Sequence, residues 1–192
     1  PVQSEKTPDG EYKLAQLVRA NMAIYDYTTA FGVPCISGKD SMKNDYQTGK
    51  MKISIPPTLL FSVIGAIPDV RLAVTMDAKQ PGDLVYILGE TRNELGGSEW
   101  LAMNRLTGNH VPRVHAAGAV RLYRALHRAI RQGLVASCHD CSDGGMAVAL
   151  AETSFAGSWG MKIDLGAVPY RGEKRNDRIL FSESASRFIV TV

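Results

Sequence analysis

Apolar residues recur at three- and four-residue spacing in two stretches of the chain. This spacing places them on one face of a helix, and it predicts amphipathic helices at residues 11–31 and 116–132. The second stretch is the more regular, because Leu122, Leu126 and Ile130 share one face while arginines occupy the other. A third helix is predicted at about residues 146–155.

Short apolar runs bounded by glycine, proline or polar residues separate these helices and predict strands. The predicted strands are residues 33–37, 54–67, 84–88, 134–138, 161–165 and 188–192, with 70–76 as a possible addition. A further helix is predicted at 92–106, and the polar segments 1–10 and 43–52 are expected to be loops. Because helices and strands alternate along the chain, the predicted fold class is α/β with mixed sheets.

Composition narrows the class of protein without identifying it. The 192 residues, of which 45% are hydrophobic, suffice for one large domain or for parts of two. The net charge of +3 is spread along the chain, which argues against nucleic acid as a partner. The longest apolar run, near residues 59–67, contains Gly65 and is too short to span a bilayer, so no membrane partner is expected. The three cysteines cannot all pair, and we expect reduced thiols in a cytoplasmic protein.

A polar motif that contains Lys39, Asp40 and Ser41 follows the predicted strand at 33–37. Such a lysine can neutralise phosphate charge and the aspartate can hold Mg²⁺, while Gly38 lets a ligand approach the backbone. The motif is not a P-loop, because the first glycine and the four-residue spacer of that motif are missing. The alternative is a polar turn between two strands, and the residues alone leave both interpretations open.

Residues 139–145 (HDCSDGG) join a predicted strand to a predicted helix, and ligands gather at such corners in α/β proteins. The two carboxylates, together with Gly144 and Gly145, suit a metal–phosphate site, and the following helix can present its positive end. The alternative is that Asp143 only caps this helix, which aspartate does well. The sequence favours neither interpretation over the other.

The sequence spacing also allows two reactive roles for Cys138, His139 and Cys141. They could bind zinc, or a cysteine could act as a nucleophile with the histidine as its base. No second pair of zinc ligands follows, and neighbours in a strand point to opposite faces, so Cys138 and His139 should diverge. Buried structural thiols are therefore the preferred interpretation for all three cysteines, including Cys35.

Two further motifs each allow a ligand-binding and a structural interpretation. Gly96 and Gly97 can bind an anion through backbone donors, whereas Ser98 can instead cap the helix that follows. Near the end of the chain, Arg187 can pair with a phosphate or with the neighbouring Glu183.

Taken together, the ordered motifs resemble the second half of the synthetase part of phosphoribosylformylglycinamidine synthase, in the aminoimidazole ribonucleotide synthetase-like superfamily. Their order and spacing match over nearly the whole chain, and both ends are expected to continue into a longer protein. The matching stretches are GVPCISGKDSM (32–42), PPTLL (56–60), GDLVYILG (82–89), ELGGSE (94–99), HDCSDGG (139–145) and FSESASR (181–187).

The resemblance implies two domains: residues 1–70 as the last part of an N-terminal-type domain, and 71–192 as most of a C-terminal-type α/β domain. It also implies an ATP-dependent ligase of purine biosynthesis. This ligase converts formylglycinamide ribonucleotide and glutamine-derived ammonia to formylglycinamidine ribonucleotide, with ATP or ADP and Mg²⁺ as cofactors. The implied partners are the remainder of the synthase and a glutaminase domain or subunit, because no glutaminase nucleophile motif is present. The N-terminal-type domain is expected to self-associate through its sheet.

The resemblance also assigns the candidate site residues. Asp143 matches the metal-liganding aspartate of an auxiliary ADP site, and Lys39, Asp40 and Ser41 match its nucleotide-proximal loop. The other candidate nucleotide contacts are Gly96, Gly97, Ser98, Gly144 and Gly145. Catalytic residues stay unassigned, because the principal active site of the family draws heavily on the first half.

Further metal ligands, a glutamate and an asparagine, lie upstream in the family, so the chain by itself is expected to be inactive. Two alternatives stay open. One is a non-catalytic scaffold or dimerisation module with an auxiliary ADP–Mg²⁺ site. The other is a related kinase or synthetase of the superfamily, such as a selenophosphate synthetase or a thiamine monophosphate kinase.

Overall fold

A computed structural model describes residues 9–41 and 44–192 of the chain. The chain divides into two units, the first ending at Ala66 and the second spanning Ile67–Val192. This division falls close to the predicted boundary at residue 70, while the assignment of the units to two domain types stays a prediction. Each unit is described by itself below.

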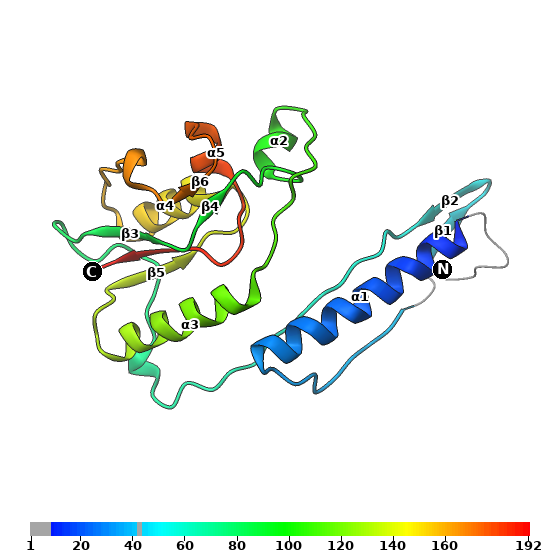
Figure 1. The fold of residues 1–192 in the computed structure, drawn as a ribbon, viewed down its shortest axis with the longest axis horizontal. Helices are drawn as coiled ribbons and strands as arrows, with labels where there is room; N and C mark the ends of the chain where they lie inside the picture. Colours follow the sequence, from blue (N-terminus) through cyan, green and yellow to red (C-terminus); the bar gives the residue numbers. More distant parts are fainter. Residues whose placement is uncertain (1–8, 42–43) are drawn as a thin grey trace. The chain divides into compact units, whose positions relative to one another are not determined.

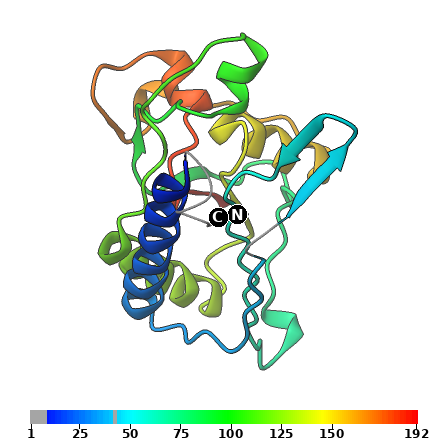
Figure 2. The same ribbon diagram turned by 90° about the vertical axis from the view of Figure 1, so that its right-hand side faces the viewer.

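Unit 1 contains one long helix and one hairpin (Figures 1 and 2). Helix α1, Gly10–Phe31, confirms the predicted helix. Strands β1, Asp45–Thr48, and β2, Met51–Ser54, pair antiparallel, so the loop predicted at 43–52 is wrong for its described residues. The turn between the strands uses Gly49 at φ +53°, a conformation that glycine adopts without strain.

The strands predicted at 33–37 and 54–67 do not form in unit 1. Their apolar composition suits a strand, but a strand also needs a neighbour for its backbone N–H and C=O groups. The hairpin ends at Ser54, and after the Ile55 N–H, which bonds to Asn44, the described chain pairs with no further strand up to Ala66. Composition therefore predicted a strand whose pairing partner is missing from the described residues.

Unit 2 is built on a three-stranded antiparallel sheet of order β3-β7-β5. Strand β7, Phe188–Thr191, is central and pairs with β3, Val85–Leu88, and with β5, Ser137–Asp140. The predictions at 84–88 and 188–192 are confirmed, whereas the third strand begins later than the predicted 134. The reason is local, because the Leu134 N–H bonds to the Ala129 carbonyl at 3.0 Å and still belongs to the end of a helix.

Two helices cover opposite faces of this sheet and confirm their predictions (Figure 1). Helix α3, Ala116–Arg131, packs Leu126 against Val190, while helix α4, Gly145–Gly157, packs Met146 against Ile189. Adjacent residues of a strand point to opposite faces, so Ile189 and Val190 separate two layers of core. Unit 2 is thus a helix–sheet–helix sandwich around β7.

The remaining elements of unit 2 are short. Strand β4, Thr91–Arg92, pairs in parallel with β6, Tyr170–Arg171, and helix α5, Asn176–Phe181, leads toward β7; the sequence did not predict these elements. The helix predicted at 92–106 shrinks to α2, Glu99–Met103. The backbone before α2 forms a hydrogen bond outside the helix, since the Gly96 N–H bonds to the His110 carbonyl at 2.8 Å.

Two predicted strands of unit 2 are wrong. In place of a strand at 70–76 the chain forms a single 3₁₀ turn, η1, Val70–Leu72, because the Asp69 carboxylate accepts a bond from the Arg71 N–H. Residues 161–165 pack apolar side chains on the core but lie in no ladder, and η2, Leu165–Ala167, follows. Even so, the α/β class with small mixed sheets is confirmed. Among the described helices, none is long and apolar enough to cross a membrane.

Candidate functional site

Three of the sequence motifs meet in space around one side chain of unit 2, Glu183. Its Oε1 atom accepts a hydrogen bond from the Glu99 N–H and a second from the Gly144 N–H, each with an N···O distance of 2.9 Å. Glu99 is the first residue of α2, and Gly144 is the N-cap of α4. The two glycine corners, 96–98 and 143–145, are therefore joined through the motif that precedes β7.

Arg187 does not form the ion pair with Glu183 that the sequence allowed. Its guanidinium is 1% exposed and donates to the Ser184 carbonyl at 2.9 Å, to the Thr91 hydroxyl at 3.0 Å and to the Ser182 carbonyl. Burial is the main influence on this group and lowers the pKa of the Arg187 guanidinium. Arg187 thus organises the loop that carries Glu183, through bonds to Ser182 and Ser184 of that loop and to Thr91.

The serines on either side of Glu183 extend the same buried polar cluster. The Ser182 hydroxyl accepts from the Glu94 N–H at 3.4 Å, and the Ser184 hydroxyl accepts from the Arg92 N–H at 3.0 Å. Glu94 in turn accepts from the Arg113 N–H at 3.1 Å. Sequence reasoning missed Thr91 and Glu94. The signal was weak, since both are single polar residues, and their side chains have described partners 96 and 19 positions away.

The 96–98 corner has the geometry of a helix start. The Ser98 hydroxyl is buried and accepts from the Leu101 N–H at 3.3 Å, which is the capping role that the sequence offered as an alternative. The Gly96 N–H is bonded to His110, and the Ser98 N–H is bonded to the Leu95 carbonyl at 3.0 Å. Gly97 is exposed. In this conformation, most of the donors that could hold an anion at this corner bond to the protein itself.

Asp143 projects from the other corner with its side chain exposed. The N-cap of α4 is Gly144 and this position uses no side-chain hydrogen bond, so the capping interpretation of Asp143 is wrong. The neighbouring Asp140 accepts from the Ser142 hydroxyl at 2.5 Å, and Glu152 lies 2.7 Å from His139 Nε2. Asp143 and Asp140, whose side chain is 62% exposed, can therefore both be reached from solvent, and Asp140 is the one bonded to Ser142.

The cysteines in this region are inert in their surroundings. Burial raises the pKa of the Cys141 thiol to about 11 and also raises the pKa of Cys138, and a protonated thiol is a poor nucleophile and metal ligand. Within residues 9–41 and 44–192, no group of three or more His, Cys, Asp or Glu residues is placed to hold a metal. The buried-thiol interpretation fits these two cysteines, while Cys35 is exposed.

The third predicted motif lies in unit 1. Lys39, Asp40 and Ser41 are all exposed, and Lys39 Nζ donates to the Ser41 hydroxyl at 2.7 Å. Met42 falls outside the described residues. The motif therefore presents an ammonium, a carboxylate and a hydroxyl to solvent within three residues, as a loop that contacts phosphates would require.

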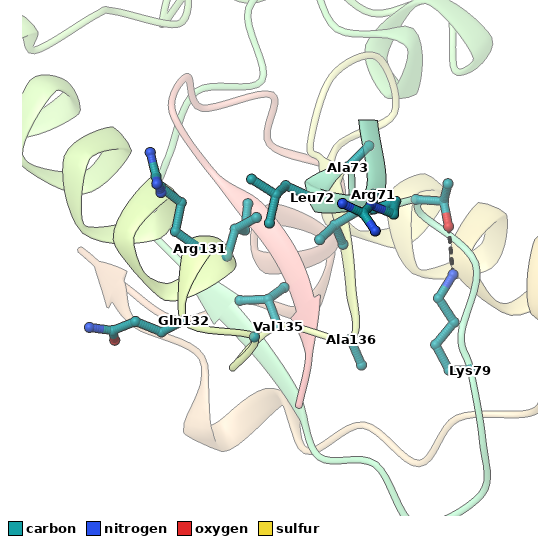
Figure 3. Close-up of a pocket in the computed structure, with 12 residues that line it drawn as sticks. Arg71, Leu72, Ala73, Lys79, Arg131, Gln132, Val135 and Ala136 are labelled. Carbon is teal, nitrogen blue, oxygen red and sulfur yellow. Dashed lines mark hydrogen bonds between the residues drawn. The ribbon is translucent and has the colours of Figure 1, made fainter. Parts of the chain in front are cut away.

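Unit 2 also contains two cavities. The smaller, about 270 Å³, borders the polar cluster and is lined in part by Glu94, Arg113 and Ser184. The larger, about 570 Å³, has Arg131 and Lys79 on opposite sides of it (Figure 3). Lys79 is paired with Asp77 at 2.6 Å, and none of the described candidate residues lines this larger cavity. Neither Glu183 nor Asp143 is among the residues that line these two cavities, so the candidate site rests on the hydrogen bonds of Glu183 and on the exposed Asp143.

Comparisons with known proteins bear on the same region. Residues 80–192 match the family model "AIR synthase related protein, C-terminal domain", which includes both glycine corners and Glu183. Phosphoribosylformylglycinamidine synthase subunit PurL of Alkaliphilus metalliredigens is 35% identical over 190 residues, which cover 98% of this chain and 24% of that protein. The same subunit from a Synechococcus species is 38% identical over 188 residues, with 96% and 24% covered.

Solved structures give the same result for the fold. The structure of T. maritima PurL complexed with FGAR matches with a TM-score of 0.57 and 26% identity, covering 64% of this chain and 21% of that one. T. maritima PurL complexed with ATP matches with a TM-score of 0.50 and 27% identity, covering 64% and 19%. The chain spans about a quarter of the length of the curated relatives it matches. The resemblance identified from the ordered motifs is confirmed, and the chain belongs to the family of AIR synthase related proteins, with residues 80–192 as its C-terminal domain.

Proposed function

We propose that this chain is part of a phosphoribosylformylglycinamidine synthase that converts formylglycinamide ribonucleotide to formylglycinamidine ribonucleotide in purine biosynthesis. The observation that supports this most directly is similarity to PurL subunits over 96–98% of the chain. ATP would supply the energy of the ligase reaction, and ammonia would come from a separate glutaminase unit. The chain would work in the cytoplasm with the rest of the synthase, and alone it would be inactive.

We propose further that the exposed corner at Asp143 contacts a nucleotide through Mg²⁺. Mg²⁺ in proteins is usually bound by one or two carboxylates together with phosphates and water, so a single exposed carboxylate fits it. The described residues place no group of three or more His, Cys, Asp or Glu at this corner, so further ligands would come from the nucleotide, water or residues outside the chain. Bound there, the metal would neutralise phosphate charge.

The remaining candidate residues would contact phosphate as well. The loop of unit 1, taken by itself, would contribute charge and hydrogen bonds through Lys39, Asp40 and Ser41. Gly144 and Gly145 have no side chain and take positive φ angles, which allows phosphates to approach. Gly96, Gly97 and Ser98 would contribute at the facing corner. Self-association through unit 1 is a further part of this proposal.

A second candidate is an auxiliary ADP–Mg²⁺ site that stabilises the enzyme without turnover. The hydrogen bonds of Glu183 favour it, because the amide donors of Glu99 and Gly144 are already held by the chain's own carboxylate. A catalytic phosphate site needs such donors free for charge that develops in the transition state. Both candidates place Asp143 at the metal, so one substitution tests the assignment that they share.

Asp143→Asn in the full-length synthase chain keeps the size of the side chain and removes its charge. We expect the variant to retain less nucleotide on purification and to melt at a lower temperature. A ligand present at a hundred times its Kd stabilises a protein by about 2.7 kcal/mol, and the variant should lose much of this. Bound nucleotide is measured by absorbance after denaturation, and melting by calorimetry with and without added ADP and MgCl₂.

Asp26→Asn, an exposed aspartate of α1, is the matched control and should behave like the wild type. If Asp143→Asn keeps as much nucleotide and melts at the same temperature in both conditions, the metal assignment is wrong. A separate assay addresses turnover. The 192-residue chain alone, given formylglycinamide ribonucleotide, ammonia, ATP and Mg²⁺, should form no product above a blank.

A further inference from the structure

Both glycine corners of unit 2 converge on a single carboxylate oxygen, Oε1 of Glu183. The two amides that it accepts from lie far apart in sequence, at Glu99 and Gly144. The amide groups at the beginning of a helix carry partial positive charge, and a carboxylate that bonds to them makes a charge-assisted hydrogen bond. The Glu183 carboxylate is thus bonded to the same kind of donors that hold phosphates in other α/β proteins.

Hydrogen bonds and burial hold the backbone around Glu183 in place. Its own N–H bonds to the Glu94 carbonyl at 3.2 Å, and Ser182 and Ser184 on either side are fully buried. Gly145 makes the close approach possible. A Cβ atom there would collide with the Ser182 carbonyl oxygen and would lie 2.9 Å from the Leu180 carbonyl oxygen. A side chain at position 145 would therefore push the Glu183 loop away from Gly144.

Helix α2 is tied to the same loop by a second contact. The rings of Trp100 and Phe181 stack with centroids 4.1 Å apart and planes 3° from parallel. Trp100 follows Glu99 directly, and Phe181 stands two residues before Glu183. The ring stacking and the hydrogen bond from the Glu99 N–H to Glu183 thus join the same two segments.

We propose that Glu183 is a built-in anion that occupies the donors of both glycine corners and thereby positions them against each other. This inference rests on the proposed function for its consequence, because a phosphate arriving at Gly144 must displace Glu183 or bind beside it. Glu183 is a positioning residue, since it fixes the backbone next to Asp143.

The test is rescue of a missing carboxylate by an anion from solution. The 192-residue wild type, Glu183→Ala, Glu183→Gln and a control, Glu173→Ala, are melted while Trp fluorescence is followed. Both tryptophans, Trp100 and Trp159, lie in unit 2, so the signal reports this unit. Each protein is measured in sodium chloride, sodium acetate and sodium phosphate at equal ionic strength and pH. Glu173 is exposed and paired with Arg178, so Glu173→Ala removes a carboxylate without touching the corners.

In chloride, Glu183→Ala should melt lower than the wild type by roughly 5 °C or more, because two amide donors lose a charged acceptor. Acetate or phosphate should recover at least half of that loss, after subtracting the change that the same salt causes in the wild type. Glu183→Gln keeps an acceptor oxygen without the charge, and its melting temperature should lie between those of the wild type and Glu183→Ala. Glu173→Ala should follow the wild type in every salt.

Two results would overturn the proposal. One is an unchanged melting temperature for Glu183→Ala, and the other is a response to acetate and phosphate no larger than that of the wild type. If Glu183→Ala does not fold, the melting temperature of Glu183→Gln is compared with that of the wild type instead. Equal melting temperatures of these two proteins in chloride would exclude a role for the negative charge of Glu183. Neither nucleotide nor Mg²⁺ enters these measurements, so failure of the proposed function leaves this test unaffected.

Discussion

Both units contain helices with apolar side chains, but other segments cover these side chains only in unit 2 among the described residues. In unit 2 the apolar faces of α3 and α4 are covered by the sheet, and Ile189 is 1% exposed. In unit 1 the apolar stripe of α1 stays open, with Met22 63% and Tyr25 71% exposed. Gly10 is the only buried residue among those described in unit 1. An amphipathic pattern therefore reveals a face but does not supply the surface that covers it.

The difference extends from packing to the backbone. Strand β7 bonds to a neighbour on both sides, whereas residues 56–66 form no described backbone hydrogen bond to other segments. These residues include Leu60 and Ile64, which are 90% and 85% exposed. The comparison teaches that apolar composition alone does not stabilise a strand, because stability comes from the ladder and from burial together.

Amide hydrogen exchange should show the largest contrast between the units. Amides of β7 open only when unit 2 unfolds, so they should exchange at least about a thousandfold more slowly than amides of residues 56–66. Exchange of the 192-residue chain is followed by mass spectrometry of peptides after pepsin digestion. Comparable protection of the two segments would show that 56–66 is held by contacts that the structure lacks.

Substitution of a buried and an exposed arginine should give the next largest contrast. Arg187→Met removes the donors for Thr91, Ser182 and Ser184, and leaving these acceptors unpaired should cost about 4 kcal/mol of unfolding free energy. Arg19→Met changes an exposed residue of α1 and should cost less than about 0.5 kcal/mol. Urea unfolding followed by Trp fluorescence measures the first effect directly. A cost below about 1 kcal/mol for Arg187→Met would mean that its buried hydrogen bonds contribute little.

Truncation of an isoleucine in each unit tests the packing contrast itself. Ile189→Ala leaves a cavity between the sheet and α4 and should cost about 3 kcal/mol. Ile64→Ala removes a side chain that is 85% exposed, and the unfolding free energy should change by less than about 0.5 kcal/mol. Circular dichroism during denaturation reports both units. A large loss for Ile64→Ala would show that the apolar surface of unit 1 is covered in solution.

The smallest effect concerns one carboxylate in each unit. Bonds from Lys79 and Thr75 lower the pKa of Asp77 to about 2, and bonds from Ser54 and Lys52 also lower the pKa of Asp45. A folded-state pKa below the unfolded value means that the stabilisation is present above about pH 4 and is lost as the pH falls toward the folded pKa. NMR titration of the carboxyl carbons should give midpoints below 3.8 for both residues. A midpoint at or above that value for either residue would show that its ion pair does not persist in solution.

Local periodicity and composition predicted the parts of the fold that depend on neighbours in sequence. The helices α1 and α3 and the strands β3 and β7 follow from their apolar patterns, α4 was also predicted as a helix, and the ordered motifs led to the family. The candidate residues around Gly96 and Gly144 were also visible, because glycine pairs before helices are a local signal. The sequence thus determined the three long helices, two of the sheet strands and the polar motifs to consider for a binding role.

Tertiary structure alone decided which of these possibilities were realised. Residues 56–66 had strand composition but pair with no strand in the described part of the chain, and β5 began three residues late because Leu134 stayed bonded to the helix before it. The role of Glu183 was invisible beforehand, since its two amide partners lie 84 and 39 positions away. Hydrogen bonds between distant segments depend on how the chain folds back on itself, and no local pattern encodes that distance.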